Sequence, residues 1–235
     1  MLGLGEAGAA SAADLVEQGV AVRGWDLDAR RSLAASPGEA VAGADVVLSV
    51  NAHALAAAES VAGSLTATQL YADLNTSSAA VKQQVAAVVA AATFVDVALL
   101  APVPGLGVRA PCLASGPGAD RFAAIFGPLG MPVEVVADAA TQKLIRSVFM
   151  KGLAAAVLES LSAAERAGCE PWLRAQIETV LEPALIDRLV EGSRLHARRR
   201  VEEMDAATAV VSDLGIEPHV ARAAAEVLRA LAGPA

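Results

Sequence analysis

The chain has 235 residues and a formal net charge of −8 at pH 7, and 55% of its residues are hydrophobic. It can therefore bury a large core, and because only 3% of its residues are aromatic, that core must consist mainly of Ala, Val and Leu. The acidic balance argues against a general nucleic-acid surface and against an anionic membrane as a partner. Charged or polar residues interrupt every apolar run before it reaches the length of a membrane span, so we expect no membrane contact.

The reactive residue types exclude further classes of protein. Two cysteines and three histidines give no recognisable metal-ligand spacing, so we expect no metal. Cys112 and Cys169 are far apart and suit free thiols in a reducing compartment. Because no secretion signal opens the chain, we expect a cytoplasmic protein. Arginine far outnumbers lysine and alanine is abundant, a composition typical of a GC-rich bacterial genome.

The chain opens with a glycine-rich turn. Its glycines, Gly3, Gly5 and Gly8, follow the pattern G-x-G-x-x-G, and Glu6 and Ala7 lie between the last two. Residues 9–17 read as a helix and residues 20–25 as a strand that ends at Asp26. A strand, turn, helix and strand followed by an acid about 20 residues on is typical of a dinucleotide-binding unit. We expect the second glycine to let the backbone approach a pyrophosphate at the helix N-terminus.

Asp26 predicts which dinucleotide binds. Its carboxylate would accept hydrogen bonds from the adenosine ribose hydroxyls and repel a 2′-phosphate, which favours NAD over NADP. Arg23, Arg30 and Arg31 favour the opposite choice, since an arginine near this loop can hold a 2′-phosphate. The cofactor is therefore expected to be NAD or NADP, with NAD favoured.

Parts of this unit are short. Only Met1 and Leu2 precede the first glycine, and residues 28–44 are few for a helix followed by a third strand. These lengths predict that the sequence is trimmed or lacks residues here.

A series of further strands and helices completes an α/β domain. Strands are expected at 44–50, 70–74, 93–99, 112–115 and 132–136, and helices at 55–65, 79–92 and 119–126. Polar loops follow two of the strands, with Asn51 after the first and Asn75 and Thr76 after the second. Because ligands bind at the carboxyl ends of strands in open α/β sheets, these residues can face a ligand. Ser77 or Ser78 can cap the following helix.

The rest of the chain is expected to be helical. Residues 139–168 form one long helix that is apolar on nearly every side, and further helices are expected at 171–181, 183–214 and 218–231. Lys143 and Ser147 share a face of the long helix, whereas Lys151 is expected to reach solvent along its stem. We therefore predict a Rossmann-type NAD(P)-binding domain over residues 1–138 and an all-α domain over residues 139–235. The apolar faces of these helices are larger than one small helical layer can bury, which favours a homodimer.

The ordered set of motifs resembles the β-hydroxyacid dehydrogenase family, relatives of 6-phosphogluconate and 3-hydroxyisobutyrate dehydrogenases. It is most similar to a bacterial branch of NAD-binding 6-phosphogluconate dehydrogenase-like proteins with a short helical C-terminal domain. The motifs are GLGEAG at 3–8, ADVVLSVN at 44–51, DLNTSS at 73–78, FVDVALLAPVPGLG at 94–107, KLIRSVFMKG at 143–152 and HARRRVEEM at 196–204.

The resemblance implies a division of roles. A helix lysine that matches Lys143 acts as general acid/base on the substrate hydroxyl during hydride transfer. Two segments line the nicotinamide: Val50, Asn51 and Ala52, and Asn75 and Thr76. The family's Ser-Gly-Gly anchor for a substrate carboxylate corresponds here to Leu100, Ala101 and Pro102, and its asparagine one turn after the lysine corresponds to Ser147. These departures imply a larger or less polar substrate.

Three functions follow from these residues. The first is an NAD(P)-dependent dehydrogenase or reductase for a small hydroxy-acid-like substrate, in which Ser147 and His196 help to bind the substrate. Because the Ser-Gly-Gly anchor is absent, an arginine must bind the substrate carboxylate in its place. The candidates are Arg109, Arg146, Arg198 and Arg199. The second is reduction of a C=N bond, as in imine reductases, which the apolar Leu100–Pro102 segment would suit. The third is a non-catalytic dinucleotide-binding protein.

Overall fold

The computed structural model describes residues 1–233, and the chain divides into two compact units, residues 1–143 and residues 144–235. The division falls five residues after the boundary expected from the sequence. The predicted helical domain, 139–235, ends with Pro234 and Ala235, which lie outside the described residues.

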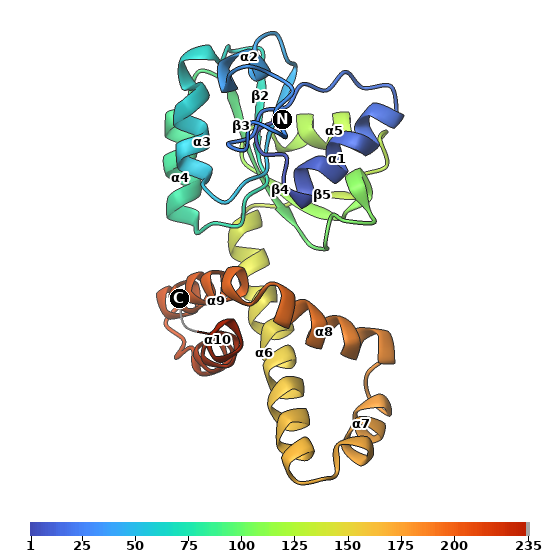
Figure 1. Cartoon of the computed structure of the whole chain (residues 1–235). Coiled ribbons are helices and arrows are strands. Elements are labelled where there is room, and N and C mark those ends of the chain that lie inside the picture. The colour runs from blue at the N-terminus through green and yellow to red at the C-terminus, as the bar shows by residue number, and fades with distance from the viewer. Residues whose placement is uncertain (234–235) are drawn as a thin grey trace. The chain divides into compact units, whose positions relative to one another are not determined.

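The first unit is built on a five-stranded sheet (Figure 1). Its strands lie side by side in chain order: β1 (Val46–Ser49), β2 (Leu70–Asp73), β3 (Thr93–Leu99), β4 (Cys112–Ser115) and β5 (Val133–Val135). β1, β2 and β3 are parallel, β4 is antiparallel to β3, and β5 is parallel to β4. The carboxyl ends of β1, β2 and β3 therefore meet at one edge of the sheet, where open α/β sheets bind ligands.

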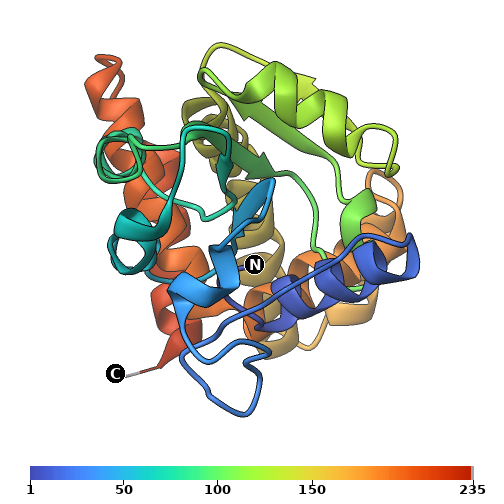
Figure 2. The same cartoon turned by 90° about the horizontal axis from the view of Figure 1, so that it is seen from above.

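Helices cover both faces of the sheet (Figures 1 and 2). One face packs against α1 (Glu6–Glu17) and α5 (Ala119–Phe126), and the other against α2 (Pro37–Val41), α3 (Ala54–Val61) and α4 (Ala79–Val88). Two short 3-10 helices, η1 (Ala62–Ser64) and η2 (Gly107–Arg109), lie in the connections. Successive β2 side chains alternate between the two cores, with Leu70 in the first and Tyr71 in the second.

The strand predicted over residues 20–25 is wrong. Only isolated parallel bridges form here, from Leu2 to Trp25 and from Leu2 to Ser49. The backbone hydrogen bonds join Trp25 to Met1 and to Gly3, so the partner segment is too short to support a longer ladder. Residues 28–44 contain the short helix α2 and no third strand.

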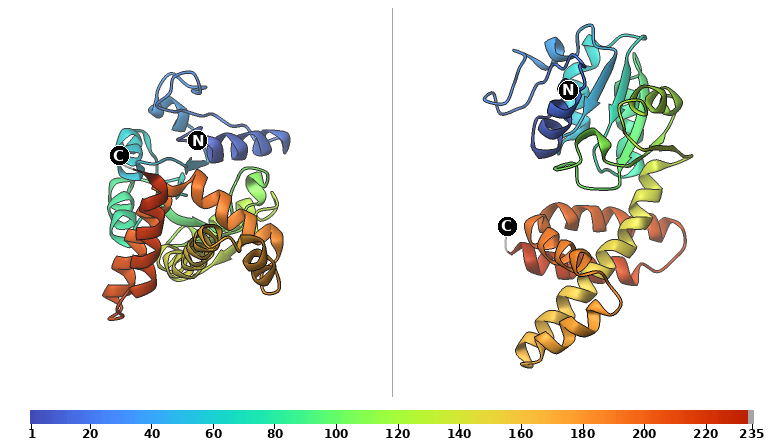
Figure 3. Two further views of the ribbon diagram at one scale, coloured as in Figure 1. Left: turned by 60° about the horizontal axis from the view of Figure 1, so that its bottom comes forward. Right: turned by 90° about the vertical axis from the view of Figure 1, so that its right-hand side faces the viewer.

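The second unit is all helical (Figure 3). Helix α6 (Ala139–Arg166) begins in the first unit and continues into the second. It is followed by α7 (Glu170–Glu178), α8 (Pro183–Leu195), α9 (Ala197–Asp213) and α10 (His219–Ala232). Leu144 of α6 packs with Met204 of α9 and Leu228 of α10, and a second cluster joins α6 to α8. The predicted fold class, a Rossmann-type α/β domain followed by helices, is confirmed.

Two details of the helical prediction are corrected. The single helix predicted over 183–214 is broken at His196, whose backbone (φ −119°, ψ 26°) leaves the helical region. Helix α6 is not buried all round, because Phe149 is 68% and Ile145 46% exposed in the single chain. That a second copy covers such side chains stays a prediction. No helix within residues 1–233 is both long enough and apolar enough to cross a membrane.

The two cysteines are predicted to differ in reactivity. Burial in β4 raises the pKa of the Cys112 thiol to about 12, whereas Cys169, just before α7, is only half-buried. Because the thiolate is the nucleophile, a disulfide reagent at about pH 8 should label Cys169 and spare Cys112 until the protein unfolds. Counting reacted thiols in native and unfolded Cys169→Ser protein checks this. Fast labelling of native Cys169→Ser protein would contradict it.

Candidate active site

The glycine turn packs directly against the loop that follows β1. Gly3 has a φ of +96°, and a β-carbon there would lie 2.1 Å from the carbonyl oxygen of Val50. A β-carbon on Gly8 would lie 2.0 Å from the carbonyl oxygen of Gly3. Both distances are far inside van der Waals contact, so only glycine fits at either position. The turn, the start of α1 and the loop after β1 therefore form one continuous backbone surface.

Gly5 differs because the space beside it is open. The nearest atom to a β-carbon built on Gly5 is Nη1 of Arg31, at 4.0 Å. Gly5 is also the N-cap of α1, and no side chain caps this end of the helix. A helix N-terminus beside a guanidinium attracts an anion. The turn thus offers open backbone and a nearby guanidinium, with Glu6 and Ala7 in the first turn of the helix behind it.

Asp26 holds the glycine turn in place. Its Oδ2 accepts a hydrogen bond from the backbone N–H of Leu4 (2.6 Å), and its Oδ1 accepts one from that of Asp28 (2.8 Å). A carboxylate has about four acceptor positions, so Asp26 retains capacity to bind a ribose hydroxyl.

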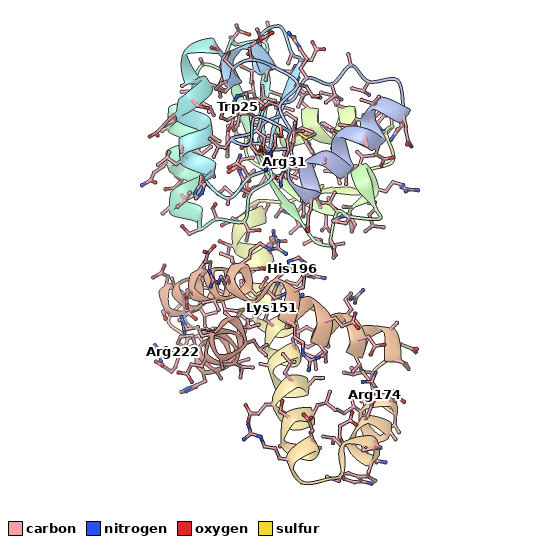
Figure 4. The ribbon with its side chains drawn as sticks, in the orientation of Figure 1. Trp25, Arg31, Lys151, Arg174, His196 and Arg222 are labelled. Carbon is pink, nitrogen blue, oxygen red and sulfur yellow. The ribbon has the colours of Figure 1, made fainter. Side chains whose placement is uncertain are left out.

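The three arginines near Asp26 have different partners. Arg23 donates to two backbone carbonyls, and Arg30 forms an ion pair with Asp28 at 2.8 Å. Arg31 lies 3.6 Å from the carboxylate of Asp28 and borders the glycine turn (Figure 4). Arg31 is therefore the arginine best placed to meet a phosphate.

An amide clamp, formed by Asn51 and Asn75, joins the loops after β1 and β2. Oδ1 of Asn75 accepts a hydrogen bond from the backbone N–H of Asn51, and its Nδ2 donates to Asp73 and to the hydroxyl of Ser49 (3.1 Å). Nδ2 of Asn51 donates to the same Ser49 hydroxyl (3.0 Å). Because Asn75 is buried and both ends of its amide are engaged, it fixes the shape of the two loops. Val50 and Ala52 flank the clamp.

Lys143 and Thr76 meet within the first unit. Nζ of Lys143, in the first turns of α6, donates a hydrogen bond to the exposed hydroxyl of Thr76 at 2.6 Å. Thr76 directly follows Asn75 of the amide clamp. The predicted general acid/base is thus in contact with a residue predicted to line the nicotinamide. The helix that begins at Ala79 is capped by the second of the two serines considered, Ser78.

The segment after β3 begins at the same edge of the sheet. Leu100 packs near the start of α6, in a cluster with Ala98, Leu113 and Ala139, and its N–H donates to Pro111. Ala101 is half-buried and Pro102 exposed. Arg109, in η2, is exposed and donates to the carbonyl of Leu106.

The other predicted substrate residues belong to the second unit. Ser147 is 1% exposed, and its hydroxyl donates to Glu203 and accepts from Lys151 (3.2 Å). Lys151 does not reach solvent as expected; it is mostly buried and lies 2.7 Å from Glu203. His196 is half-buried at the junction of α8 and α9 (Figure 4). Arg146, Arg198 and Arg199 are exposed.

Sequence reasoning missed a buried charged triad, Lys82, Asp73 and Asp96. Nζ of Lys82 lies 3.0 Å from the carboxylate of Asp73 and 2.7 Å from that of Asp96. The available signal was an acid inside each of two otherwise apolar strands, which requires a buried partner. Among residues 1–233, no group of His, Cys, Asp and Glu side chains is arranged to hold a metal ion.

Comparison by sequence gives two partial matches. A family model described as a domain of unknown function, DUF1932, matches residues 164–231. An uncharacterized 28.5 kDa protein of Methanothermus fervidus, encoded in a 7S RNA 5′ region, is 31% identical over 142 residues, which are 57% of this chain and 55% of that protein. The chain therefore spans about half the length of the curated relative that it matches.

Comparison by structure covers nearly the whole chain. A conserved hypothetical protein from Sinorhizobium meliloti 1021 is 28% identical, with a TM-score of 0.72 over 97% of this chain and 85% of that one. A 3-hydroxyisobutyrate dehydrogenase from Salmonella typhimurium is 18% identical, with a TM-score of 0.80 over 97% and 91%. A reductive aminase from Aspergillus terreus is 19% identical, with a TM-score of 0.61 over 97% and 90%.

The chain has the β-hydroxyacid dehydrogenase fold. The solved structures that share it include 3-hydroxyisobutyrate dehydrogenases and a protein described as similar to 3-hydroxyacid dehydrogenases. The resemblance inferred from the sequence is confirmed at the level of the fold. At 18–20% identity the dehydrogenase and aminase likenesses establish architecture, so chemistry must be argued from the residues.

Removing the buried carboxylate of the second unit is predicted to destabilise it. In Glu203→Ala protein the Lys151 ammonium would lose its carboxylate, which we expect to cost about 3–5 kcal/mol of unfolding free energy. The exposed neighbour Glu202→Ala should cost less than about 0.5 kcal/mol. Denaturant unfolding followed by circular dichroism measures both.

The unfolding free energy of Glu203→Ala protein should also depend on pH. Burial lowers the pKa of Lys151 and Glu203 opposes the shift, so removing Glu203 should lower that pKa further. The unfolded chain would then bind more protons than the folded chain, and stability would rise as the pH climbs towards the ordinary lysine pKa of about 10.4. Equal stability of the Glu203→Ala and Glu202→Ala proteins, or a loss of stability in Glu202→Ala alone, would refute the claim that Glu203 stabilises the buried ammonium of Lys151.

Proposed function

We propose that the chain is an NAD(P)-dependent oxidoreductase that transfers a hydride between a nicotinamide dinucleotide and a small hydroxy-acid-like substrate. The observation that carries the proposal is the 2.6 Å contact between Lys143 Nζ and Thr76, next to the amide clamp and on the same sheet edge as the glycine turn. The named dehydrogenases that share the fold support the same reaction class.

The first unit has a separate set of groups for each part of a dinucleotide. The open backbone at Gly5, the start of α1 and the guanidinium of Arg31 suit the diphosphate. The carboxylate of Asp26 suits the adenosine ribose. The rigid loops held by Asn51 and Asn75 suit the flat nicotinamide ring, which supplies hydride transfer when it is bound.

Lys143 has the chemistry to move the remaining proton. Oxidation of a secondary alcohol removes a hydride from carbon and a proton from oxygen. An unprotonated amine accepts that proton as the C=O bond forms and returns it in the reverse reaction. The hydroxyl of Thr76 holds the amine at the sheet edge, so that the lysine needs little reordering when the substrate arrives.

Reduction of a C=N bond is a second candidate. Leu100, Ala101 and Pro102 present an apolar segment where a carboxylate anchor is expected, and the reductive aminase of Aspergillus terreus shares the fold. An apolar segment suits a neutral imine better than a hydroxy acid. A non-catalytic dinucleotide-binding role is the third candidate, and the experiment below separates it from the other two.

Replacing Lys143 tests the proposal. Lys143→Ala should lower turnover by about 10²–10⁴-fold while leaving dinucleotide affinity within a few-fold, because general acid/base groups contribute that much to rate. Gln142→Ala, at the exposed neighbouring position of α6, is the matched control and should keep full turnover. Turnover is followed by cofactor absorbance with a panel of hydroxy acids, aldehydes and cyclic imines. Unchanged turnover in Lys143→Ala protein would remove this lysine from the mechanism, and dinucleotide binding without turnover of any substrate would favour the third candidate.

We further propose that Asp26 favours NAD over NADP. Because a carboxylate repels a 2′-phosphate, Asp26→Asn should raise the affinity for NADP relative to NAD by about 10-fold or more. Asp45→Asn makes the same charge change at an exposed position before β1, away from the carboxyl edge, and should leave the ratio unchanged. Calorimetric titration of both dinucleotides gives the ratio. A clear NADP preference in the unaltered protein would refute the proposal and direct attention to Arg31.

A further inference from the structure

A buried lysine sits between two buried carboxylates beneath the candidate site. Lys82 of α4 and the carboxylates of Asp73 and Asp96 have side chains that are 7%, 0% and 8% exposed. The ammonium has three close acceptors: the carboxylate of Asp73 at 3.0 Å, its backbone carbonyl at 3.0 Å and the carboxylate of Asp96 at 2.7 Å. The backbone carbonyl of Asp73 accepts a hydrogen bond from this ammonium, and the two carboxylates form ion pairs with it.

The triad belongs to a polar row that crosses the sheet. Asp73 of β2 pairs in register with Ser49 of β1 on one side and with Asp96 of β3 on the other, and Asp96 pairs with Ser115 of β4. All four residues are at most 6% exposed. A row of polar side chains inside an apolar sheet is costly, and its members must satisfy one another.

The row is connected to the amide clamp through one carboxylate. Oδ2 of Asp73 faces Lys82, while Oδ1 accepts hydrogen bonds from the backbone N–H (3.1 Å) and the side-chain amide of Asn75. Asn75 in turn fixes the N–H of Asn51. A continuous chain of contacts therefore runs from Lys82 through Asp73 and Asn75 to the loop after β1.

We propose that Lys82 is a positioning residue for the nicotinamide end of the dinucleotide, acting through Asp73 on the amide clamp. The inference rests on the proposed function, because it assumes that the loops after β1 and β2 line the nicotinamide. Without the ammonium, two buried carboxylates on adjacent strands repel each other, and one must move or take up a proton. Either change removes the fixed acceptor that orients Asn75. The glycine turn has supports outside the clamp, namely the bond from the N–H of Leu4 to Asp26 and the backbone bonds of Leu2 and Gly3, so we expect the diphosphate end to depend less on Lys82.

The inference is tested by comparing two ligands that differ only in the nicotinamide. Calorimetry on the full chain measures NAD⁺ and ADP-ribose binding, or NADP⁺ and ADP-ribose 2′-phosphate if the wild type prefers the phosphorylated cofactor. Lys82→Met should weaken dinucleotide binding by about 10-fold or more, since hydrogen bonds to charged groups carry energies of that order. It should leave the affinity for the truncated ligand within about two-fold.

Two further variants separate positioning from simple loss of stability. Val85→Ala removes a fully buried side chain from the same helix without touching the triad, and should lower the melting temperature yet keep both affinities. Lys82→Met combined with Asp96→Asn removes the repulsion as well as the ammonium, and should recover part of the dinucleotide affinity. Hydrogen exchange at the Asn51 amide should be faster in Lys82→Met protein than in Val85→Ala protein.

The possible outcomes are distinct. Selective loss of dinucleotide affinity in Lys82→Met protein, with partial rescue and faster Asn51 exchange, supports the inference. Equal loss for both ligands, no loss for either, or the same selective loss in Val85→Ala protein overturns it. If the wild type binds none of these ligands, the proposed function itself fails, and that failure is visible before any variant is made.

Discussion

The first unit depends on one contact, the packing of the glycine turn against the carbonyl of Val50. Gly3 has a left-handed φ and leaves no room for a β-carbon, and a β-carbon on Gly8 would clash with the carbonyl oxygen of Gly3. This contact joins the first loop of the chain to the loop after β1. Because the two backbones touch, the open space at Gly5 and the ends of β1 and β2 become parts of a single edge. The hydrogen bond that Asp26 accepts from Leu4 and the bonds within the amide clamp then hold that edge rigid.

Few charged side chains are buried among the residues that the structure describes. The three lysines of the chain each have a defined partner: Lys82 between two aspartates, Lys151 against Glu203, and Lys143 against the hydroxyl of Thr76. A buried ion pair stabilises a protein less than an apolar pair of similar volume, so its presence calls for another explanation. For Lys82 that explanation is the line of contacts to Asn75. Lys143 is only half-buried, and its bond to the hydroxyl of Thr76 places it at the sheet edge where a ligand is expected.

The sequence correctly predicted the strands and helices whose bounds depend on local residue patterns. β3, β4 and α5 have the predicted bounds, and α6 ends within two residues of its predicted end, because apolar runs and helix-forming stretches identify such elements directly. The strand over 20–25 failed because a strand needs a partner of its own length, and the bridging segment around Leu2 is shorter. The break at His196 lies between two good helix-forming segments and carries no glycine or proline to mark it.

The site was predictable only in part. The glycine pattern identified the turn, and the resemblance led to Lys143, which does meet Thr76. Spacing along a helix could not reveal that Ser147 is buried against Glu203, or that the amide of Asn75 is directed at Ser49 and Asp73, because these partners lie far away in the chain. The most direct measurement is a crystal structure of the protein with NAD⁺ or NADP⁺. The account predicts the diphosphate over Gly5 and the nicotinamide within contact of Thr76 and Lys143; a dinucleotide bound away from the carboxyl ends of β1 and β2 would contradict it.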